Sequence, residues 1–286
     1  MKKVLLTGAG GFVGSRIREH LRDRYDVTVC PRGMLGAVTQ EQLHAFVQEA
    51  APEVIIHTAA IADMGVCEKN PDASFRANVE LTQWICQEAR NVGAKALCFS
   101  SDQVYNACRP EDGPYREDMR LSPGNVYGRH KLEGEQRGLD VLPDALMLRA
   151  TWMYDMPGYG LPVRGNLMMN LLTQAMHGRA QAYSATDFRG ITYVRQVAQL
   201  VEAAFEAPGG AYNFGSDNPL SMVQLVRGAF RDMGLSEERI HELVQEDHSL
   251  PVRCLRMDQT KLRQNGLFFD ETAEGIRRCL QDYRMG

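Results

Sequence analysis

Short, continuous apolar runs alternate with longer segments of helical periodicity through the first half of the chain. The apolar runs are Val4 to Thr7, Val27 to Cys30, Val54 to Thr58, Ala96 to Ser100 and Ala145 to Arg149. Runs that are continuous rather than alternating are typical of parallel strands covered on both faces. Between the runs, apolar residues recur at helical spacing, so the pattern predicts repeated βαβ units and an α/β fold with a doubly wound parallel sheet.

The pattern changes after Arg149. Residues 155–165 are rich in glycine and proline, which predicts a loop near a ligand. Further predicted elements are helices near 167–177 and 194–205, a strand near 211–214, and a helix with a capping box formed by Ser221 and Gln224. We therefore predict a nucleotide-binding domain over 1–155 with returning segments near 190–215. A smaller, mostly helical C-terminal substrate lobe takes 156–189 and 216–286.

Composition and charge narrow the classes of function. The chain has 286 residues and a net charge of -4, which argues against a nucleic-acid partner. Its seven cysteines form no CxxC pair or metal-ligand spacing, so we expect reduced thiols in a cytoplasmic protein and no metal site. The N-terminal apolar stretch is too short for a signal peptide, and we predict no membrane partner.

A glycine-rich turn follows the first predicted strand and opens the first predicted helix. It reads TGAGGFVG, and we predict that its residues after the threonine bind the phosphates of a dinucleotide, namely Gly8, Gly10, Gly11, Phe12, Val13 and Gly14. Glycines allow a tight turn and close approach of the backbone to a pyrophosphate, while the helix N-terminus offers free N–H groups. The predicted sheet is therefore of the Rossmann type.

The second predicted strand ends without the acidic residue that would bind the ribose 2'-hydroxyl of NAD. Arg32 stands there instead and could pair with a 2'-phosphate. The sequence thus favours NADP(H) as the cofactor, with NAD(H) as the alternative.

Two further segments carry candidate chemistry. Tyr127 and Lys131 are four residues apart in a predicted helix and so lie on one face, where an ammonium favours the phenolate form of tyrosine. The segment FSSDQVY ends the fourth apolar run, and its Ser101, Asp102 and Gln103 either cap the strand or face a substrate.

The order of these motifs resembles the extended short-chain dehydrogenase/reductase family. The stretches PGNVYGRHKLEGE, LRATWMY, RANVELT and GAYNFGS are similar to its dTDP-4-dehydrorhamnose reductase branch, which also includes the regulatory subunit of methionine adenosyltransferase. The resemblance implies NADPH-dependent reduction of a 4-keto-6-deoxy nucleotide sugar. The alternatives that it leaves are a non-catalytic NADP-binding regulatory subunit and a sugar-nucleotide epimerase or dehydratase.

The resemblance also implies roles for residues. Tyr127 would protonate the C4 keto oxygen, Lys131 would hold the nicotinamide ribose, and Ser101 would hydrogen-bond the same oxygen. The implied cofactor contacts are Thr58, Ala59, Ala60 and Asn78, and the implied substrate contacts are Ser101 and Trp152, with Asp102 and Gln103 beside Ser101. Arg189 or Arg164 would supply the local positive charge that a nucleotide diphosphate needs. Family dehydratases have a glutamate base where Gln103 stands, and because an amide cannot take up a proton, this residue favours reduction. A homodimer is a further expectation from the family.

Overall fold

A six-stranded parallel sheet forms the centre of the computed structural model, which describes residues 1–31 and 33–284. In spatial order its strands are β2 (Asp26–Val29), β1 (Lys3–Thr7), β3 (Val54–His57), β4 (Lys95–Ser101), β5 (Leu146–Ala150) and β10 (Gly210–Phe214). Each boundary lies within one residue of the predicted apolar run. The predicted α/β fold with a parallel sheet is confirmed.

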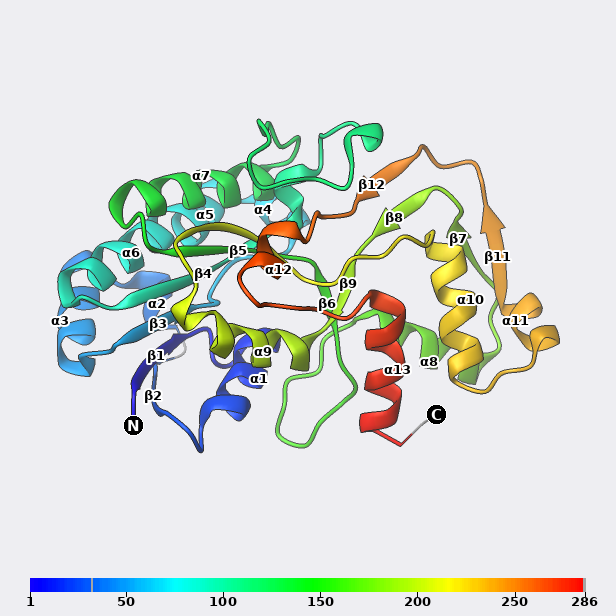
Figure 1. Cartoon of the computed structure of the whole chain (residues 1–286), viewed down its shortest axis with the longest axis horizontal. Coiled ribbons are helices and arrows are strands. Elements are labelled where there is room, and N and C mark those ends of the chain that lie inside the picture. The colour runs from blue at the N-terminus through cyan, green and yellow to red at the C-terminus, as the bar shows by residue number, and fades with distance from the viewer. Residues whose placement is uncertain (32, 285–286) are drawn as a thin grey trace.

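Helices cover both faces of the sheet (Figure 1). One face packs against α1 (Phe12–Leu21) and α9 (Val194–Ala203), and the other against α3 (Gln40–Ala50), α6 (Leu81–Val92) and α7 (Val126–Val141). The strand order reverses between β1 and β3, because the chain runs from β1 outwards to β2 and then crosses back. Ligands of such sheets bind in the crevice outside the carboxyl ends of the strands at this reversal.

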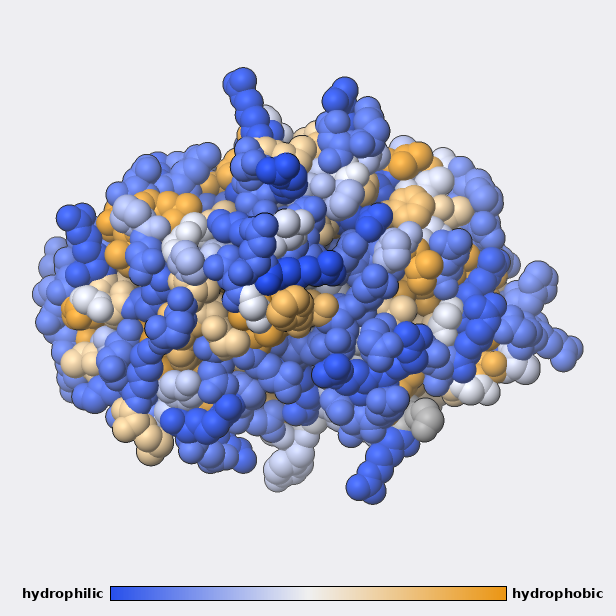
Figure 2. Space-filling view, viewed as in Figure 1, coloured by the Kyte–Doolittle hydropathy of each residue, from blue (hydrophilic) through white to orange (hydrophobic). Residues whose placement is uncertain are grey.

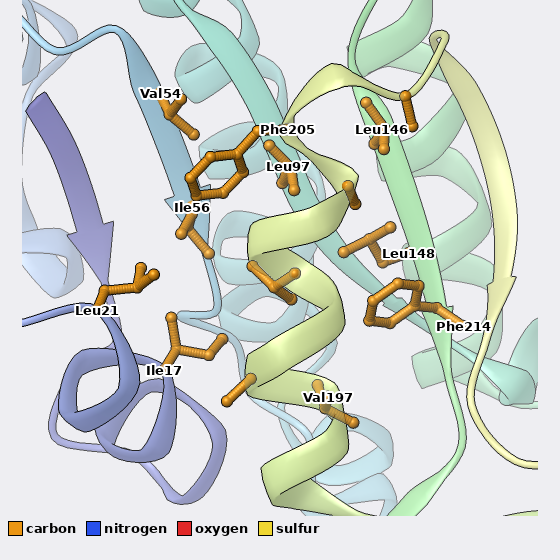
Figure 3. Packing of buried hydrophobic residues seen from close by; sticks show 14 of the residues in the cluster. Ile17, Leu21, Val54, Ile56, Leu97, Leu146, Leu148, Val197, Phe205 and Phe214 are labelled. Atoms are coloured by element: carbon orange, nitrogen blue, oxygen red, sulfur yellow. The ribbon is translucent and has the colours of Figure 1, made fainter. Parts of the chain in front are cut away.

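Side chains of each strand alternate between two hydrophobic cores. Leu6 and Ile56 point to the face of α1 and α9, whereas the neighbouring Leu5 and Ile55 point to the opposite core. Figure 3 shows α9 lying across the strands, with Ile17 of α1 beside it. Since both neighbours in a strand are buried, the strand sequences are continuously apolar.

Short helical segments lie between the strands and longer helices of the first part of the chain, and one more lies just before β10. They are α2 (Met34–Ala37), α4 (Met64–Lys69), α5 (Pro71–Phe75), the π-helical η1 (Arg76–Glu80), and the 3-10 segments η2 (Asp102–Tyr105), η3 (Pro110–Asp112) and η4 (Ala204–Glu206).

A second group of elements has its own hydrophobic core. Its helices are α8 (Leu167–His177), α10 (Met222–Asp232), α11 (Glu237–Leu243) and α13 (Thr272–Asp282), while α12 (Thr260–Gln264) packs on the sheet. The capping box of Ser221 and Gln224 is present at the start of α10. The exact division of the chain into a nucleotide-binding domain and a substrate lobe stays a prediction.

Three two-stranded parallel ladders accompany the helices of this second group, and the sequence pattern did not predict them. They pair β6 (Trp152–Tyr154) with β9 (Ile191–Tyr193), β8 (Asp187–Arg189) with β12 (Arg253–Leu255), and β7 (Gln181–Ser184) with β11 (Val244–Asp247). Strands of three or four residues are too short to give a hydrophobic period. The second lobe is therefore less purely helical than we expected.

The displayed face of the molecule is mostly hydrophilic. Figure 2 shows small apolar groups separated by hydrophilic residues on the displayed face. Among the described residues, no helix has the length and apolar character that crossing a bilayer requires. All seven cysteines lie within the described residues and are free thiols.

Candidate active site

The glycine turn between β1 and α1 is packed too closely for side chains at two of its positions. Gly8 has a φ of +71°, and a Cβ there would lie 2.5 Å from the Thr58 hydroxyl oxygen. A Cβ on Gly14 would lie 2.2 Å from the Gly8 carbonyl oxygen. These two glycines allow the turn to close against the end of β3.

The remaining glycines of the turn differ from each other. Gly11 is the N-cap of α1 and, having no side chain, leaves the first N–H groups of the helix without a side-chain acceptor. Gly10 is exposed, and a Cβ there would meet nothing within 4 Å. The N-terminus of α1 therefore presents N–H donors and a positive dipole end, which together favour an anion.

A cavity of about 620 Å³ opens at the carboxyl ends of β1, β3, β4 and β5, where the strand order reverses. Most of the predicted site residues line it, namely Gly8, Gly11, Phe12, Val13, Gly14, Thr58, Ala60, Ser101, Asp102, Gln103, Tyr127, Lys131, Trp152 and Arg189. Gly10, Ala59 and Asn78 lie outside its lining, and Arg32 lies outside the described residues. Residues distant in sequence thus meet around one space.

Tyr127 enters the cavity from the first turn of α7. The helix begins there because the Asn125 side chain accepts a hydrogen bond from the Gly128 N–H at 2.7 Å, and Glu68 accepts one from the Val126 N–H at 2.8 Å. Burial raises the pKa of Tyr127 to about 12, against the lowering effect of the Ser101 hydroxyl beside it. The tyrosine is therefore protonated at neutral pH.

Lys131 lies one turn further along α7 and is also buried. Its ammonium donates a hydrogen bond to the Phe99 carbonyl oxygen at 2.9 Å and lies 5.9 Å from the centre of the Tyr127 ring. Burial lowers the pKa of Lys131 to about 8. The sequence argument expected this ammonium to favour the phenolate of Tyr127, whereas burial, which disfavours the phenolate, is the largest effect on the pKa of this tyrosine.

Ser101 ends β4 and combines the two roles that the sequence left open. Its hydroxyl oxygen accepts a hydrogen bond from the Gln103 N–H at 3.2 Å, which is a strand-end cap. The same hydroxyl lines the cavity and donates to Asp102 Oδ1 at 3.2 Å. The Gln103 amide also donates to Asp102 Oδ1, at 3.1 Å.

Across the cavity, Arg189 faces the same carboxylate. Its Nη2 lies 3.5 Å from Asp102 Oδ2, and its guanidinium carbon lies 5.7 Å from the centre of the Trp152 ring. Within the described residues, neither Asp102 Oδ2 nor Arg189 Nε has a hydrogen-bond partner, although both atoms are buried. Trp152 is 37% exposed, so its indole borders the cavity and is not a core residue. These groups are available to a polar ligand.

Asn78 and His57 make hydrogen bonds next to the cavity that hold the end of β3 and the segment after it in place. The Asn78 amide donates to the Ile61 carbonyl oxygen at 3.0 Å and to the Ser74 hydroxyl at 3.2 Å, so it holds the segment that follows β3. His57 Nδ1 lies 2.8 Å from the Thr7 hydroxyl oxygen, and burial lowers the pKa of this histidine to about 3. His57 is thus a neutral, packed residue at the end of β3.

Sequence reasoning missed one cationic residue of the lining and only touched on another. Arg253 lies in β12, a strand that the sequence pattern did not predict, and pairs loosely with Asp187 at 3.9 Å. Arg164, in the loop before α8, also lines the cavity. Neither position carries a motif, so only the folded chain brings these arginines to the site.

Comparisons with known proteins cover nearly the whole chain. The family model described as the RmlD substrate binding domain matches residues 1–285. Methionine adenosyltransferase 2 subunit beta of Xenopus tropicalis is 34% identical over 283 residues, 93% of this chain and 83% of that protein. The dTDP-4-dehydrorhamnose reductase of Aggregatibacter actinomycetemcomitans is 27% identical over 203 residues, 70% and 66% of the two chains. The crystal structure of the Bacillus anthracis dTDP-4-dehydrorhamnose reductase in complex with NADP has a TM-score of 0.85 at 23% identity and covers 99% of both chains.

Proposed function

Because the chain belongs to the RmlD substrate binding domain family, we propose that it is an NADPH-dependent reductase of a 4-keto-6-deoxy sugar linked to a nucleoside diphosphate. One observation carries the proposal: Ser101, Tyr127 and Lys131 border the same cavity as the glycine turn. Reduction of a ketone requires a hydride at the carbon and a proton at the oxygen from groups on one site. The predicted resemblance to the extended short-chain dehydrogenase/reductase family is supported by the reductases among the relatives.

Tyr127 is the proton donor in this proposal. Its raised pKa keeps the hydroxyl protonated until a developing alkoxide takes the proton. Ser101 hydrogen-bonds the same substrate oxygen after its hydroxyl turns away from Asp102. Lys131, positively charged below a pH of about 8, stabilises the phenolate that Tyr127 becomes.

The glycine turn and its surroundings fit a dinucleotide. The uncapped N-terminus of α1 offers N–H groups to a pyrophosphate, and the small Ala60 leaves room on the far side of β3. NADPH bound there supplies the hydride to the carbonyl carbon. The absence of an acidic residue at the end of β2 and the presence of Arg32 favour the phosphorylated cofactor, which the Bacillus anthracis reductase also binds.

The cavity also fits the diphosphate of a sugar nucleotide. Arg164, Arg189 and Arg253 line it, and no described acidic residue other than Asp63 and Asp102 does so. Guanidinium groups bind phosphate oxygens through paired hydrogen bonds. We assign the sugar to the space between these arginines and Tyr127, beside the exposed Trp152 ring.

The test is the oxidation of NADPH by the purified protein in the presence of dTDP-4-dehydrorhamnose. The wild type should consume NADPH, and Tyr127→Phe should lose at least about 100-fold in kcat, the range expected for removal of a general acid. Tyr159→Phe is the control, because Tyr159 is fully exposed and outside the cavity lining. An inactive wild type, or a Tyr127→Phe variant with unchanged turnover, would refute the proposal.

A second candidate is favoured by one specific observation. The relative that is 34% identical over 93% of the chain is a subunit of methionine adenosyltransferase rather than a reductase. The protein would then bind NADP in the same cavity and regulate such an enzyme without turnover. Stable co-purification with a methionine adenosyltransferase, together with no reduction of any keto sugar nucleotide, would establish this function in place of the first.

A further inference from the structure

Glu135 shares a helix face with the two residues that we placed in the reaction. Tyr127, Lys131 and Glu135 stand at intervals of four residues along α7, so their side chains follow one another on the same side of the helix. Glu135 is 3% exposed. An ionised carboxylate in such a buried position is unfavourable unless it is paired, so Glu135 requires a partner of opposite charge.

The partner is Arg149 of β5, which is equally buried. Arg149 Nε donates to both carboxylate oxygens of Glu135 at 3.1 Å, and Nη2 donates to Oε2 at 2.7 Å. Arg149 Nη1 donates to the Tyr105 hydroxyl at 2.7 Å, and that hydroxyl donates to Asn213 Oδ1 at 2.8 Å. The guanidinium thereby joins α7, β5, η2 and β10.

The end of β4 is fastened to the same helix face. The Phe99 carbonyl oxygen accepts from Lys131, and the hydroxyl of the next residue, Ser100, donates to Glu135. The residue after that is Ser101, whose hydroxyl is beside the Tyr127 phenol. Three consecutive strand residues are therefore in contact with three positions of α7, and Glu135 holds the middle strand residue, Ser100.

We propose that the Glu135–Arg149 ion pair positions the reactive groups, fixing Ser101 and Lys131 relative to Tyr127 and keeping a negative charge one helical turn from the Lys131 ammonium. Glu135 is a positioning residue in this scheme, because it acts through Ser100 and Lys131 rather than on a ligand. The effect on turnover rests on the proposed function. The effect on Lys131 does not, because it exists in the protein without ligands.

Glu135 is one of the groups around Lys131 that affect the pKa of this lysine, so removing Glu135 should change that pKa. His57 faces Lys131 from β3, Cys98 from β4 and Cys67 from α4, and Glu135 faces it from its own helix. Burial lowers the pKa of Lys131, and Cys98, Glu135 and Cys67 oppose that lowering. Of these three, Glu135 is the one held in a buried ion pair, with Arg149.

The experiment substitutes Glu135→Gln, which keeps the size of the side chain and removes its charge. The side-chain titration of Lys131 is followed by NMR in ligand-free protein labelled at the lysine ε-carbon. The chain has six lysines, and a Lys131→Met sample identifies the signal. We expect the pKa of Lys131 to fall by about 1 unit. We also expect kcat for keto-sugar reduction to fall about 10- to 100-fold with little change in KM, because the reacting groups are misplaced rather than lost.

The matched control is Glu133→Gln. Glu133 lies on the same helix and also pairs with an arginine, Arg137, at 2.6 Å, but both side chains are about 40% exposed. This variant should keep the Lys131 titration and the kcat of the wild type. A folded Glu135→Gln protein with both properties unchanged would overturn the proposal.

A double variant covers the case in which Glu135→Gln does not fold because Arg149 is left unpaired. Glu135→Met combined with Arg149→Met removes both charges and keeps comparable volume, a replacement that proteins often tolerate. We expect it to fold, to show the lowered Lys131 pKa and to lose at least about 10-fold in kcat. A folded double variant with wild-type values would contradict the proposal. If the wild type reduces no keto sugar, the proposed function fails, while the NMR titration still decides the role of Glu135.

Discussion

Replacing Gly14 by alanine should damage the nucleotide site through a steric effect that can be worked out from the turn. The added Cβ would lie 2.2 Å from the Gly8 carbonyl oxygen and 2.8 Å from the Thr58 hydroxyl oxygen. Ordinary contact begins near 3.4 Å, so the turn must move by roughly 1 Å. Overpacking of this kind costs about 1–3 kcal/mol, while the better helix propensity of alanine returns about 1 kcal/mol. Gly14→Ala should therefore lower the free energy of unfolding by up to about 2 kcal/mol.

Binding of NADPH should suffer as well, because the same displacement moves the N–H groups of α1. A loss of about 1.4–2.8 kcal/mol corresponds to a 10- to 100-fold rise in Kd, measured by fluorescence titration of the purified protein. Gly228→Ala, on α10 and outside the cavity lining, is the control, since a Cβ there meets nothing within 4 Å. We expect its Kd to match the wild type and its urea midpoint not to fall. Equal damage from both substitutions, or none from Gly14→Ala, would refute this steric reasoning.

Three further predictions concern buried or partly buried charges. Lys131→Met should abolish reduction. It should also raise the free energy of unfolding at pH 7 by about 2 kcal/mol, because burial of the charged ammonium, whose pKa falls from 10.5 to about 8, opposes folding. In the wild type, the free-energy cost of burying the Lys131 ammonium is complete below pH 8 and disappears as the pH rises towards 10.5. Urea unfolding at several pH values should therefore show that the stability gain of Lys131→Met shrinks over that interval. Arg189→Gln should raise KM for the nucleotide sugar about 10-fold and leave Kd for NADPH unchanged, in steady-state and titration assays respectively. Arg16→Met should lower the free energy of unfolding by about 3 kcal/mol, measured in urea, because it removes the closer arginine, at 2.9 Å, from the fully buried Asp155 carboxylate and leaves Arg195 at 3.8 Å.

The sequence was sufficient for features that depend on neighbouring residues in the chain. The apolar runs located five of the six strands of the central sheet, because strands buried on both faces need continuous apolar sequence, and the sixth, β10, was predicted near 211–214. The glycine turn was recognisable from its spacing, because Gly14 meets the backbone of Gly8 within the same short segment. The spacing of Tyr127 and Lys131 placed them on one helix face, and both do line the cavity.

Features that depend on tertiary contacts could not be predicted in this way. Arg253 reaches the cavity only through the ladder of β8 and β12, whose strands are short and polar. Asn78 was expected near the cofactor, yet its amide is used to hold Ile61, which no local pattern reveals. The raised pKa of Tyr127 depends on burial, and burial is a property of the assembled fold.

That raised pKa changes the relation between Tyr127 and Lys131 that the sequence implied. A phenol activated by a nearby ammonium would be partly ionised and suited to removing a proton, whereas a phenol with a pKa of about 12 gives a proton only when a stronger base forms beside it. A developing alkoxide is such a base, so the free protein is already in the state that reduction needs. In the proposed reduction the lysine acts after the transfer, when its charge stabilises the new phenolate of the buried Tyr127 beside it. In the proposed function, burial of this pair keeps the proton donor protonated at neutral pH, and the Gln103 amide stands where family dehydratases have a glutamate base, which disfavours dehydration.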